Sequence, residues 1–185
     1  MSGVAVWSDS LIDPTLGVVR VWATETGVRR IEFESSAGDV SLGETLSDGP
    51  PQQHMMDALT ALREYFAGRL RAFDLPLDLA HATPFQLKVY QRLLQIPYGH
   101  VATYGEVARD IGGEPNTARA VGGAVGANPI AVVVPCHRVV AADGELVGFM
   151  GGLPRKAALL RLEGIDVDGV RPSSRVHPEV IRLPL

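Results

Sequence analysis

The feature that most constrains this chain is an apolar run at residues 130–134, which leads into a Pro-Cys-His-Arg turn at residues 135–138 and resumes at residues 139–140. A run this apolar, followed by a β-branched pair, predicts a buried element. The turn within it carries Cys136, the single cysteine of the chain, where that element ends. The pattern therefore predicts that the thiol of Cys136 and the imidazole of His137 lie close to the core of the protein.

The neighbouring side chains of Cys136 and His137 have two interpretations. A free thiol is mostly protonated at neutral pH because its ordinary pKa is about 8.5. An imidazole that accepts its proton, directly or through a water, turns the thiol into a nucleophile. A buried cysteine is nevertheless most often a small hydrophobic residue, and a histidine beside it a satisfied polar neighbour. Adjacency alone leaves both interpretations open.

Composition excludes several classes of protein. The chain has 185 residues, of which 46% are hydrophobic and 21% charged, and this is typical of a soluble globular protein with one domain or two small ones. No apolar run reaches about 18 residues and the N-terminus lacks a basic flank, so we expect neither a membrane span nor a signal peptide. A single cysteine permits no internal disulfide and no multi-cysteine zinc site, and it favours a reducing cytoplasm.

Charge is unevenly distributed along the chain, whose net charge is −4. Residues 1–81 hold 6 basic and 12 acidic residues, whereas residues 82–165 hold 8 basic and 6 acidic residues. Because basic groups attract nucleic acid, a nucleic acid partner would bind the second half, with few phosphate contacts and modest affinity. Random scatter of charge would explain the same counts.

The first half of the chain predicts a β-hairpin followed by a helix. Two β-rich runs, residues 18–22 and 28–33, are separated by a Glu-Thr-Gly turn signal. Residues 34–53 are rich in Ser, Gly, Asp and Pro and predict a loop. Residues 55–67 place apolar side chains at helical spacing. Alternation over residues 73–79 predicts an exposed or edge strand.

The second half predicts three helices that include a helix-turn-helix. Thr83 at an N-cap and the proline after it open the first helix. A Thr-x-x-Glu capping box at residues 103–106 opens a short second helix. The third helix spans residues 118–125, with Asn116 or Thr117 at its N-cap.

These patterns place a domain boundary near residue 81. We expect an N-terminal domain over residues 1–81 and a C-terminal domain over residues 82–170. Residues 171–185 are expected to form an irregular tail, since the end of the chain is rich in proline.

Taken together, these segments resemble a known family. Residues 135–139, Pro-Cys-His-Arg-Val, resemble the active-site motif of the O6-alkylguanine-DNA alkyltransferases, also called methylated-DNA–protein-cysteine methyltransferases. The resemblance is dense over residues 83–165 and looser over the hairpin at residues 13–33. The other matching segments, in order and at family spacing, are residues 96–99, 103–108, 118–124, 128–129, 151–153 and 156–164.

The resemblance implies a fold and an activity. The fold would be an α/β ribonuclease-H-like N-terminal domain and a mainly α, winged-helix-like C-terminal domain that binds DNA and carries the active site. The activity would be direct-reversal DNA repair: Cys136 takes a methyl or other alkyl group from O6 of guanine in double-stranded DNA, irreversibly and once per molecule, after the nucleotide is flipped out. Activity on O4 of thymine stays open.

The resemblance also implies where and with what the protein acts. It implies no cofactor, no metal and no membrane. We expect a monomer in the cytoplasm of a bacterium, associated with the nucleoid when it is on DNA. Cooperative binding along DNA stays open.

Roles for individual residues are likewise implied by the resemblance. His137 would be the base that acts through a water, Glu163 would orient His137, and Asn128 would tie the cysteine turn to the recognition helix. Arg119 would fill the gap left by the flipped base, and Tyr104 would help to rotate it. Further DNA-facing residues would be Thr103, Ala118, Ala120, Gly122 and Gly123. The alkylguanine pocket would include Pro135, Val139, Phe149, Met150 and Gly151.

Each of these roles has a plainer alternative. Arg119 suits an ordinary phosphate contact or a solvated helix position, and Tyr104 suits a core position. The glycines of the third helix suit close helix packing inside the protein as well as close approach to a narrow groove. Phe149 stands where the family usually carries a tyrosine, so it can pack against a base but cannot donate a hydrogen bond to the guanine O6.

Three other functions are alternatives for the whole chain. A non-catalytic alkylguanine-binding protein would share the DNA-binding fold, but its cysteine is replaced, whereas Cys136 is present here. A helix-turn-helix regulator with Cys136 as a sensor would need further domains. A cysteine peptidase would need a histidine that meets Cys136 in space, and adjacent residues of an extended segment point apart.

Overall fold

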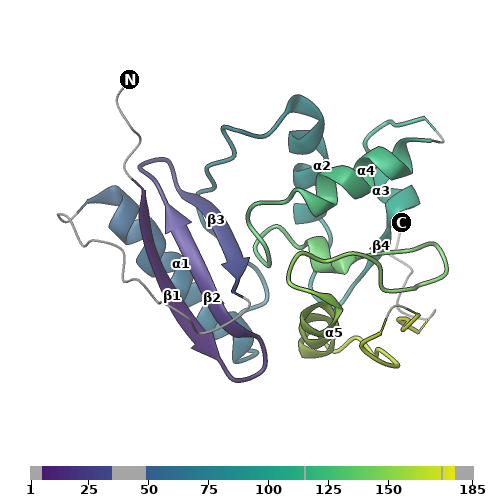
Figure 1. The fold of residues 1–185 in the computed structure, drawn as a ribbon. Coiled ribbons are helices and arrows are strands. Elements are labelled where there is room, and N and C mark those ends of the chain that lie inside the picture. Colours follow the sequence, from purple (N-terminus) through teal and green to yellow (C-terminus); the bar gives the residue numbers. More distant parts are fainter. Residues whose placement is uncertain (1–5, 35–48, 115, 172, 178–185) are drawn as a thin grey trace. The chain divides into compact units, whose positions relative to one another are not determined.

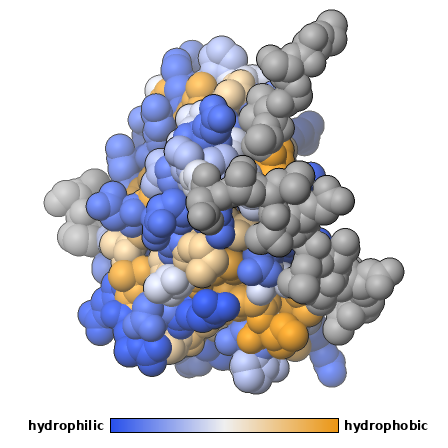
Figure 2. Space-filling model, turned by 90° about the vertical axis from the view of Figure 1, so that its left-hand side faces the viewer, coloured by the Kyte–Doolittle hydropathy of each residue, from blue (hydrophilic) through white to orange (hydrophobic). Residues whose placement is uncertain are grey.

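The computed structural model describes residues 6–34, 49–114, 116–171 and 173–177. The chain divides into two compact units, Met1–Ala80 and His81–Leu185 (Figure 1). In the space-filling view of Figure 2, hydrophilic side chains predominate and hydrophobic ones form separate patches. Among the described residues, no helix is both long and apolar enough to cross a membrane.

The first unit is an antiparallel sheet covered by one helix. Strands β1 (Trp7–Asp13), β2 (Gly17–Ala23) and β3 (Val28–Phe33) pair in the order β1-β2-β3. Helix α1 (Pro50–Phe66) lies across one face (Figure 1). The side chains that alternate toward α1 are fully or almost fully buried, and they include Leu11, Val19, Val21, Ala23 and Ile31.

Two features of this unit differ from the sequence-based expectations. The hairpin is confirmed, but β1 was not predicted, because Trp7–Asp13 buries Leu11 alone and leaves Ile12 73% exposed. Helix α1 begins at Pro50 instead of residue 55, since proline is tolerated in the first helical turn. The expected loop at residues 34–53 is therefore partly helical, and its residues 35–48 lie outside the described residues.

The expected strand at residues 73–79 forms only one bridge. Leu77 pairs in parallel with Val28, and Val28 N–H donates to the Pro76 carbonyl at 2.8 Å. A Cβ built on Gly27 would lie 2.3 Å from that carbonyl oxygen, so glycine is required for this close approach. The contact holds residues 76–78 to the sheet without extending it.

The second unit is mainly helical and contains a short parallel pair of strands. Its elements are α2 (Pro84–Leu94), β4 (Ala102–Thr103), α3 (Tyr104–Asp110), α4 (Thr117–Gly126), the 3₁₀ turn η1 (Cys136–Arg138), β5 (Val139–Val140) and α5 (Leu153–Leu162). Helices α2, α3 and α4 pack together, while η1 contacts α5 (Figure 1). Strand β4 pairs with β5, so the start of α3 and the cysteine turn lie side by side.

The three predicted helices are confirmed, and so are the predicted N-cap at Thr83 and the predicted capping box at Thr103. Thr83 Oγ1 accepts from Gln86 N–H at 3.2 Å, and Thr103 Oγ1 accepts from Glu106 N–H at 3.1 Å. Asn116 is the N-cap of α4, but its side chain makes no capping hydrogen bond. Local sequence signals therefore begin α2 and α3, whereas tertiary packing has to stabilise α4.

The apolar run at residues 130–134 is buried as expected, but it forms a tight turn. Ala131 bridges Val134, and Val132 has φ +72°. A β-branched residue at positive φ is strained, typically by about 1–3 kcal/mol, and persists only where its surroundings hold it. Tertiary contacts therefore hold the turn before Cys136 in its strained conformation.

Part of the expected tail belongs to the core of the second unit. Val176 pairs with Val167, and both are buried in one cluster with Val101, Val140 and Leu146. Within residues 173–177, Val176 and Ser174 are therefore buried, whereas the other three residues are exposed. Residues 178–185 of the expected tail lie outside the described residues.

The Thr83 cap generates a stability prediction. Replacing Thr83 with alanine leaves the Gln86 N–H without its side-chain acceptor, so we expect the free energy of unfolding to fall by about 1 kcal/mol. Urea unfolding followed by circular dichroism measures the change. Thr60→Ala, at an exposed position within α1, is the control and should not destabilise the chain. Equal stability of Thr83→Ala and the unmodified protein would contradict the capping role.

Candidate active site

Cys136 begins η1 and is almost entirely buried, with 6% of its surface exposed. Its N–H donates to the Val134 carbonyl at 2.7 Å. Asn128, which follows α4, donates from Nδ2 to that same carbonyl at 2.9 Å and accepts from Ile130 N–H at 3.0 Å. Asn128 therefore fixes the strained turn at both ends and ties the cysteine to the end of α4.

A narrow pocket reaches Cys136. Phe149 and Met150 line it, and Met150 is 56% exposed. Pro135, Val139 and Gly151 are not among its lining residues. The complete lining is Val125, Gly126, Asn128, Ala131, Cys136, Gly148, Phe149 and Met150. The cavity is thus mainly apolar, with a thiol and an amide as its polar side-chain groups.

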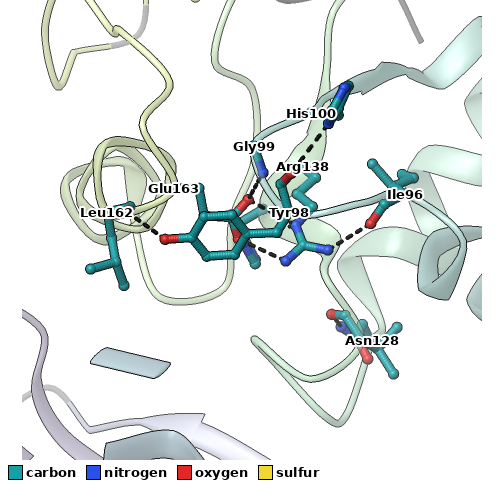
Figure 3. A network of polar contacts seen from close by, with 10 residues as sticks. Ile96, Tyr98, Gly99, His100, Asn128, Arg138, Leu162 and Glu163 are labelled. Atoms are coloured by element: carbon teal, nitrogen blue, oxygen red, sulfur yellow. Dashed lines mark hydrogen bonds and ion pairs between the residues drawn. The ribbon is translucent and has the colours of Figure 1, made fainter. Parts of the chain in front are cut away.

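Residues from several segments bond the buried carboxylate of Glu163 (Figure 3). Glu163 Oε1 lies 2.9 Å from His137 Nε2. Arg138 donates from Nε to Oε1 and Oε2, at 3.0 and 2.9 Å, and from Nη2 to Oε1 at 2.8 Å. Gly99 N–H donates to Oε2 at 3.1 Å, and Arg138 Nη1 donates to the Ile96 carbonyl at 2.6 Å. The carboxylate thereby joins the end of α5, the loop after α2 and the cysteine turn.

Electrostatics keep Glu163 ionised and His137 neutral. Burial alone would raise the pKa of Glu163, but the hydrogen bonds from His137 and Arg138 and the positive charge of Arg138 outweigh it, and the pKa falls to about 2. Burial lowers the pKa of His137 against the opposing effect of Glu163, and the charges of Arg138 and Lys156 lower it further. The ionised carboxylate accepts a hydrogen bond from Nε2–H, so the lone pair of the neutral ring is at Nδ1.

The pKa of Cys136 reflects a balance between burial and its polar neighbours. Burial raises it, while the Asn128 hydrogen bond and then the charge of Lys156 lower it. Lys156, on α5, has no exposed surface, and its Nζ donates to the carbonyls of Val139 at 2.6 Å and Val147 at 2.7 Å. Burial lowers the pKa of Lys156 to about 8, although Cys136 opposes the shift.

The predicted DNA-facing residues lie on α3 and α4. Arg119, Ala120 and Gly123 are exposed, whereas Ala118 and Gly122 are partly buried. A Cβ on Gly122 would lie 3.9 Å from the Tyr104 ring, while a Cβ on Gly123 would meet nothing within 4 Å. Packing inside the unit therefore does not explain Gly123.

Tyr104 and Thr103 lie at the start of α3, beside the cysteine turn. Burial, followed by the charge of Cys136, raises the pKa of Tyr104 to about 12, so its hydroxyl is protonated at neutral pH. Thr103 is buried and caps α3, which gives it a structural role.

Sequence reasoning missed the partners that stabilise this site. Arg138 was recognised within the motif but not as the ion-pair partner of Glu163, and Lys156 was recognised only as part of the last helix. The side chains of Arg138 and Lys156 also donate hydrogen bonds to backbone carbonyls, and a carbonyl partner of this kind cannot be recognised in a sequence. Among the described residues, no group of three His, Cys, Asp or Glu side chains could hold a metal ion.

The shared carboxylate generates a prediction with a matched control. Glu163→Gln leaves the buried charge of Arg138 uncompensated, so we expect the free energy of unfolding to fall by about 3–5 kcal/mol. Glu64→Gln, which breaks the exposed pair with Arg69, should change stability little. Chemical denaturation of both variants measures the difference, and similar small effects would refute the anchoring role of Glu163.

The pH dependence of stability provides a second readout of the same prediction. The folded-state pKa of Glu163 lies below its ordinary 4.5, so its contribution is present above that pH and is lost as the pH falls toward about 2. Glu163→Gln should lack this part of the acid destabilisation. A variant that loses stability with acid in the same way as the unmodified protein would count against the assignment.

Two domain families match the chain. The DNA binding domain of 6-O-methylguanine DNA methyltransferase matches residues 84–165. The ribonuclease-like domain of 6-O-methylguanine DNA methyltransferase matches residues 9–79. These matches confirm the expected fold class, an N-terminal ribonuclease-like domain with an antiparallel sheet and a helical C-terminal domain.

Individual relatives agree with the domain matches. A methylated-DNA–protein-cysteine methyltransferase of Mycobacterium bovis is 56% identical over 106 residues, which are 57% of this chain and 63% of that protein. One from Methanosarcina acetivorans is 37% identical over 155 residues, which are 84% of this chain and 97% of that protein. The match to the Mycobacterium bovis protein thus spans less than two thirds of its length.

A solved structure is similar over most of both chains. The crystal structure of Mycobacterium tuberculosis OGT in complex with DNA has a TM-score of 0.71 and 40% identity, covering 84% of this chain and 91% of that chain. The domain matches, the Methanosarcina acetivorans relative and this structure agree on one family. The chain therefore belongs to the 6-O-methylguanine DNA methyltransferase family.

Proposed function

We propose that this protein repairs alkylated double-stranded DNA by moving a methyl or other alkyl group from O6 of guanine onto Cys136, once per molecule. The observation that carries the proposal is the position of Cys136. The single thiol of the chain lines an apolar pocket, and the next residue, His137, pairs with the buried carboxylate of Glu163. It would act as a monomer on DNA, without a cofactor.

The proposed step is a direct displacement at the alkyl carbon. Cys136 Sγ forms a bond to that carbon while the bond from carbon to guanine O6 breaks, and the electron pair passes to O6. The thiol proton passes through a water to His137 Nδ1, the basic atom of a ring held by Glu163. The proton taken up by His137 then passes through water to the guanine, so the base leaves neutral and the imidazole returns to its neutral form. The product thioether has no easy leaving route, so each molecule acts once.

Access to the base explains the exposed small residues of α4. A guanine O6 in stacked duplex DNA is out of reach of a buried thiol, so the nucleotide has to be flipped out at a cost of about a few kcal/mol. Exposed Ala120 and Gly123 let the α4 backbone approach a narrow groove, and exposed Arg119 can fill the space left in the stack. Tyr104, beside Gly122, is placed to guide the rotated nucleotide.

The rim of the pocket departs from the usual family pattern. Phe149 and Met150 line it with apolar side chains, and neither side chain has a hydroxyl to donate to the guanine O6. An aromatic ring and a thioether can still pack against a flipped base. The lack of such a donor is the observation that favours the second candidate function, binding of alkylguanine without transfer.

Mass spectrometry tests the proposed function. The protein is mixed with a duplex oligonucleotide that contains one O6-methylguanine, and intact mass and peptide mapping follow. We expect one added methyl group per molecule, located on Cys136, and none in Cys136→Ala. Tight binding of the lesion with no mass change would replace the proposal with the lesion-binding function, and neither transfer nor lesion preference would refute both.

Gly123, an exposed glycine of α4, generates a prediction in which one substitution raises stability and weakens DNA binding. Gly123→Leu should raise helix stability by about 0.8 kcal/mol, because a Cβ there meets no other group of the protein. The same side chain should hinder approach to DNA and weaken duplex binding. Thermal unfolding and fluorescence anisotropy measure the two effects. Thr60→Leu, exposed on α1, should not weaken binding, and unchanged DNA affinity of Gly123→Leu would rule out close approach at this position.

A further inference from the structure

The segment of residues 166–177 follows the matched DNA binding domain, which spans residues 84–165, and the proposed reaction gives it no role. It nevertheless forms a short hairpin, in which Val167 pairs antiparallel with Val176. Asp168 supports this pairing, because its N–H donates to the Arg175 carbonyl at 3.2 Å and its Oδ1 accepts from the Arg175 N–H at 2.7 Å. We call the described part of the segment, residues 166–171 and 173–177, the clamp hairpin.

One side of the clamp hairpin is fixed to the last helix. Arg161, in the last turn of α5, donates from Nη2 to the carbonyl of Val167 at 2.8 Å and to that of Gly169 at 3.1 Å. The side chains of Val167 and Val176 are buried in the same cluster as Leu160 of α5. Helix α5 therefore supports the hairpin through both polar and apolar contacts.

The other side of the clamp hairpin binds the turn of residues 141–147 through the backbone. An antiparallel bridge joins the two segments. Leu146 N–H donates to the Ser174 carbonyl at 2.8 Å, and Val176 N–H donates to the Gly144 carbonyl at 3.0 Å. The Leu146 side chain is buried in one cluster with Val176. The clamp hairpin thus adds a short strand to this turn and buries the apolar side chain at its end.

The turn of residues 141–147 lies between the cysteine and the rim of the pocket along the chain. It follows β5, which continues from the turn of Cys136, and it leads into residues 148–150, which line the pocket. The turn also has bonds within itself, and the Val147 carbonyl accepts one from Lys156. Loops that are held mainly by local bonds open easily. A partner from a distant part of the sequence is therefore expected to limit the motion of this turn and of the rim that follows it.

We infer that the clamp hairpin is a positioning segment for the proposed reaction: by binding the turn of residues 141–147, it holds the rim at residues 148–150 in place to enclose a flipped alkylguanine. A pocket wall can contribute to recognition only while the residues behind it hold it in place. The inference rests on the proposed function for its substrate. Its physical content, the order of the rim and the enclosure of Cys136, can be measured without DNA.

The test detaches the clamp hairpin by one substitution. Val176→Asp places a carboxylate in an apolar cluster, and burial of an unpaired charge is costly, so the hairpin should come away from the turn. Val170→Asp is the matched control, because it makes the same change in the same hairpin at a side chain that is 42% exposed. Val176→Ala removes part of the apolar contact without adding a charge and serves as the second variant. Circular dichroism checks that each variant is folded.

Two measurements on the protein alone report on the rim. Hydrogen exchange with mass spectrometry measures the protection of the peptide of residues 147–153, in which Gly152 N–H donates to the Phe149 carbonyl at 2.8 Å. Iodoacetamide, a small neutral electrophile, alkylates Cys136, the single cysteine, and at fixed pH its rate reports on access to the thiol.

We expect Val176→Asp to lose protection in the rim peptide and to react several-fold faster with iodoacetamide, because local opening exposes both. Val176→Ala should change both values in the same direction and by less. Val170→Asp should behave as the unmodified protein does.

Methyl transfer provides the readout on the substrate. Single-turnover rates at increasing concentrations of an O6-methylguanine duplex separate the half-saturating concentration from the maximal rate. We expect Val176→Asp to raise the half-saturating concentration several-fold and to change the maximal rate less, because the rim encloses the base. Its affinity for an undamaged duplex should stay the same, since α4 is the proposed contact with the duplex. A hairpin that only stabilised the fold would not produce this difference in a folded variant.

The outcomes separate this inference from the proposed function. Unchanged protection of the rim peptide in folded Val176→Asp overturns the inference, whatever the transfer rate, and Val176→Ala carries the same test if Val176→Asp does not fold. If neither variant folds, the hairpin stabilises the whole unit, and a local effect on the rim is wrong. If the unmodified protein accepts no methyl group from DNA, the proposed function is wrong, yet exchange and iodoacetamide still decide whether the hairpin holds the rim.

Discussion

The C-terminal unit depends on the ionised, buried carboxylate of Glu163. It is bonded by an imidazole, a guanidinium and a backbone N–H from separate segments, and so it is stable only when all of them are in place. A buried ion pair of this kind adds little net stability relative to apolar packing, but the loss of one partner is severe. The ionised Glu163 carboxylate instead holds the His137 ring in one orientation and one tautomer.

A second constraint comes from the backbone before Cys136. Val132 lies at positive φ within a fully buried turn, and Asn128 bonds both ends of that turn. Strain of this kind persists where the surroundings over-determine the conformation. Side-chain ammonium, amide and carboxylate groups thus position one short segment, while the hydrophobic cluster around Val140 and Val176 supports it from behind.

The parts of the fold that could be predicted from sequence are those with local causes. The capping boxes at Thr83 and Thr103 and the Glu-Thr-Gly turn act within a few residues, and their helices and hairpin are where we expected them. Strand β1 was missed because its pairing partner, and not its own pattern, makes it a strand. For the site, the Cys-His pair and Glu163 could be found by resemblance. The hydrogen-bond acceptors of Arg138 and Lys156 could not be predicted, because they include backbone carbonyls that only the tertiary fold brings within reach.

The near-complete enclosure of Cys136 also bears on how an unused molecule ages. Under the proposed function each thiol reacts only once, so a molecule that is oxidised before it meets a lesion would be lost for repair. Oxidation proceeds through the exposed thiolate, and burial both limits contact with oxidants and keeps the sulfur protonated at rest. By limiting oxidation of Cys136, the pocket would prolong the time over which an unused molecule can still react, and under the proposed function the number of such molecules sets the capacity for repair.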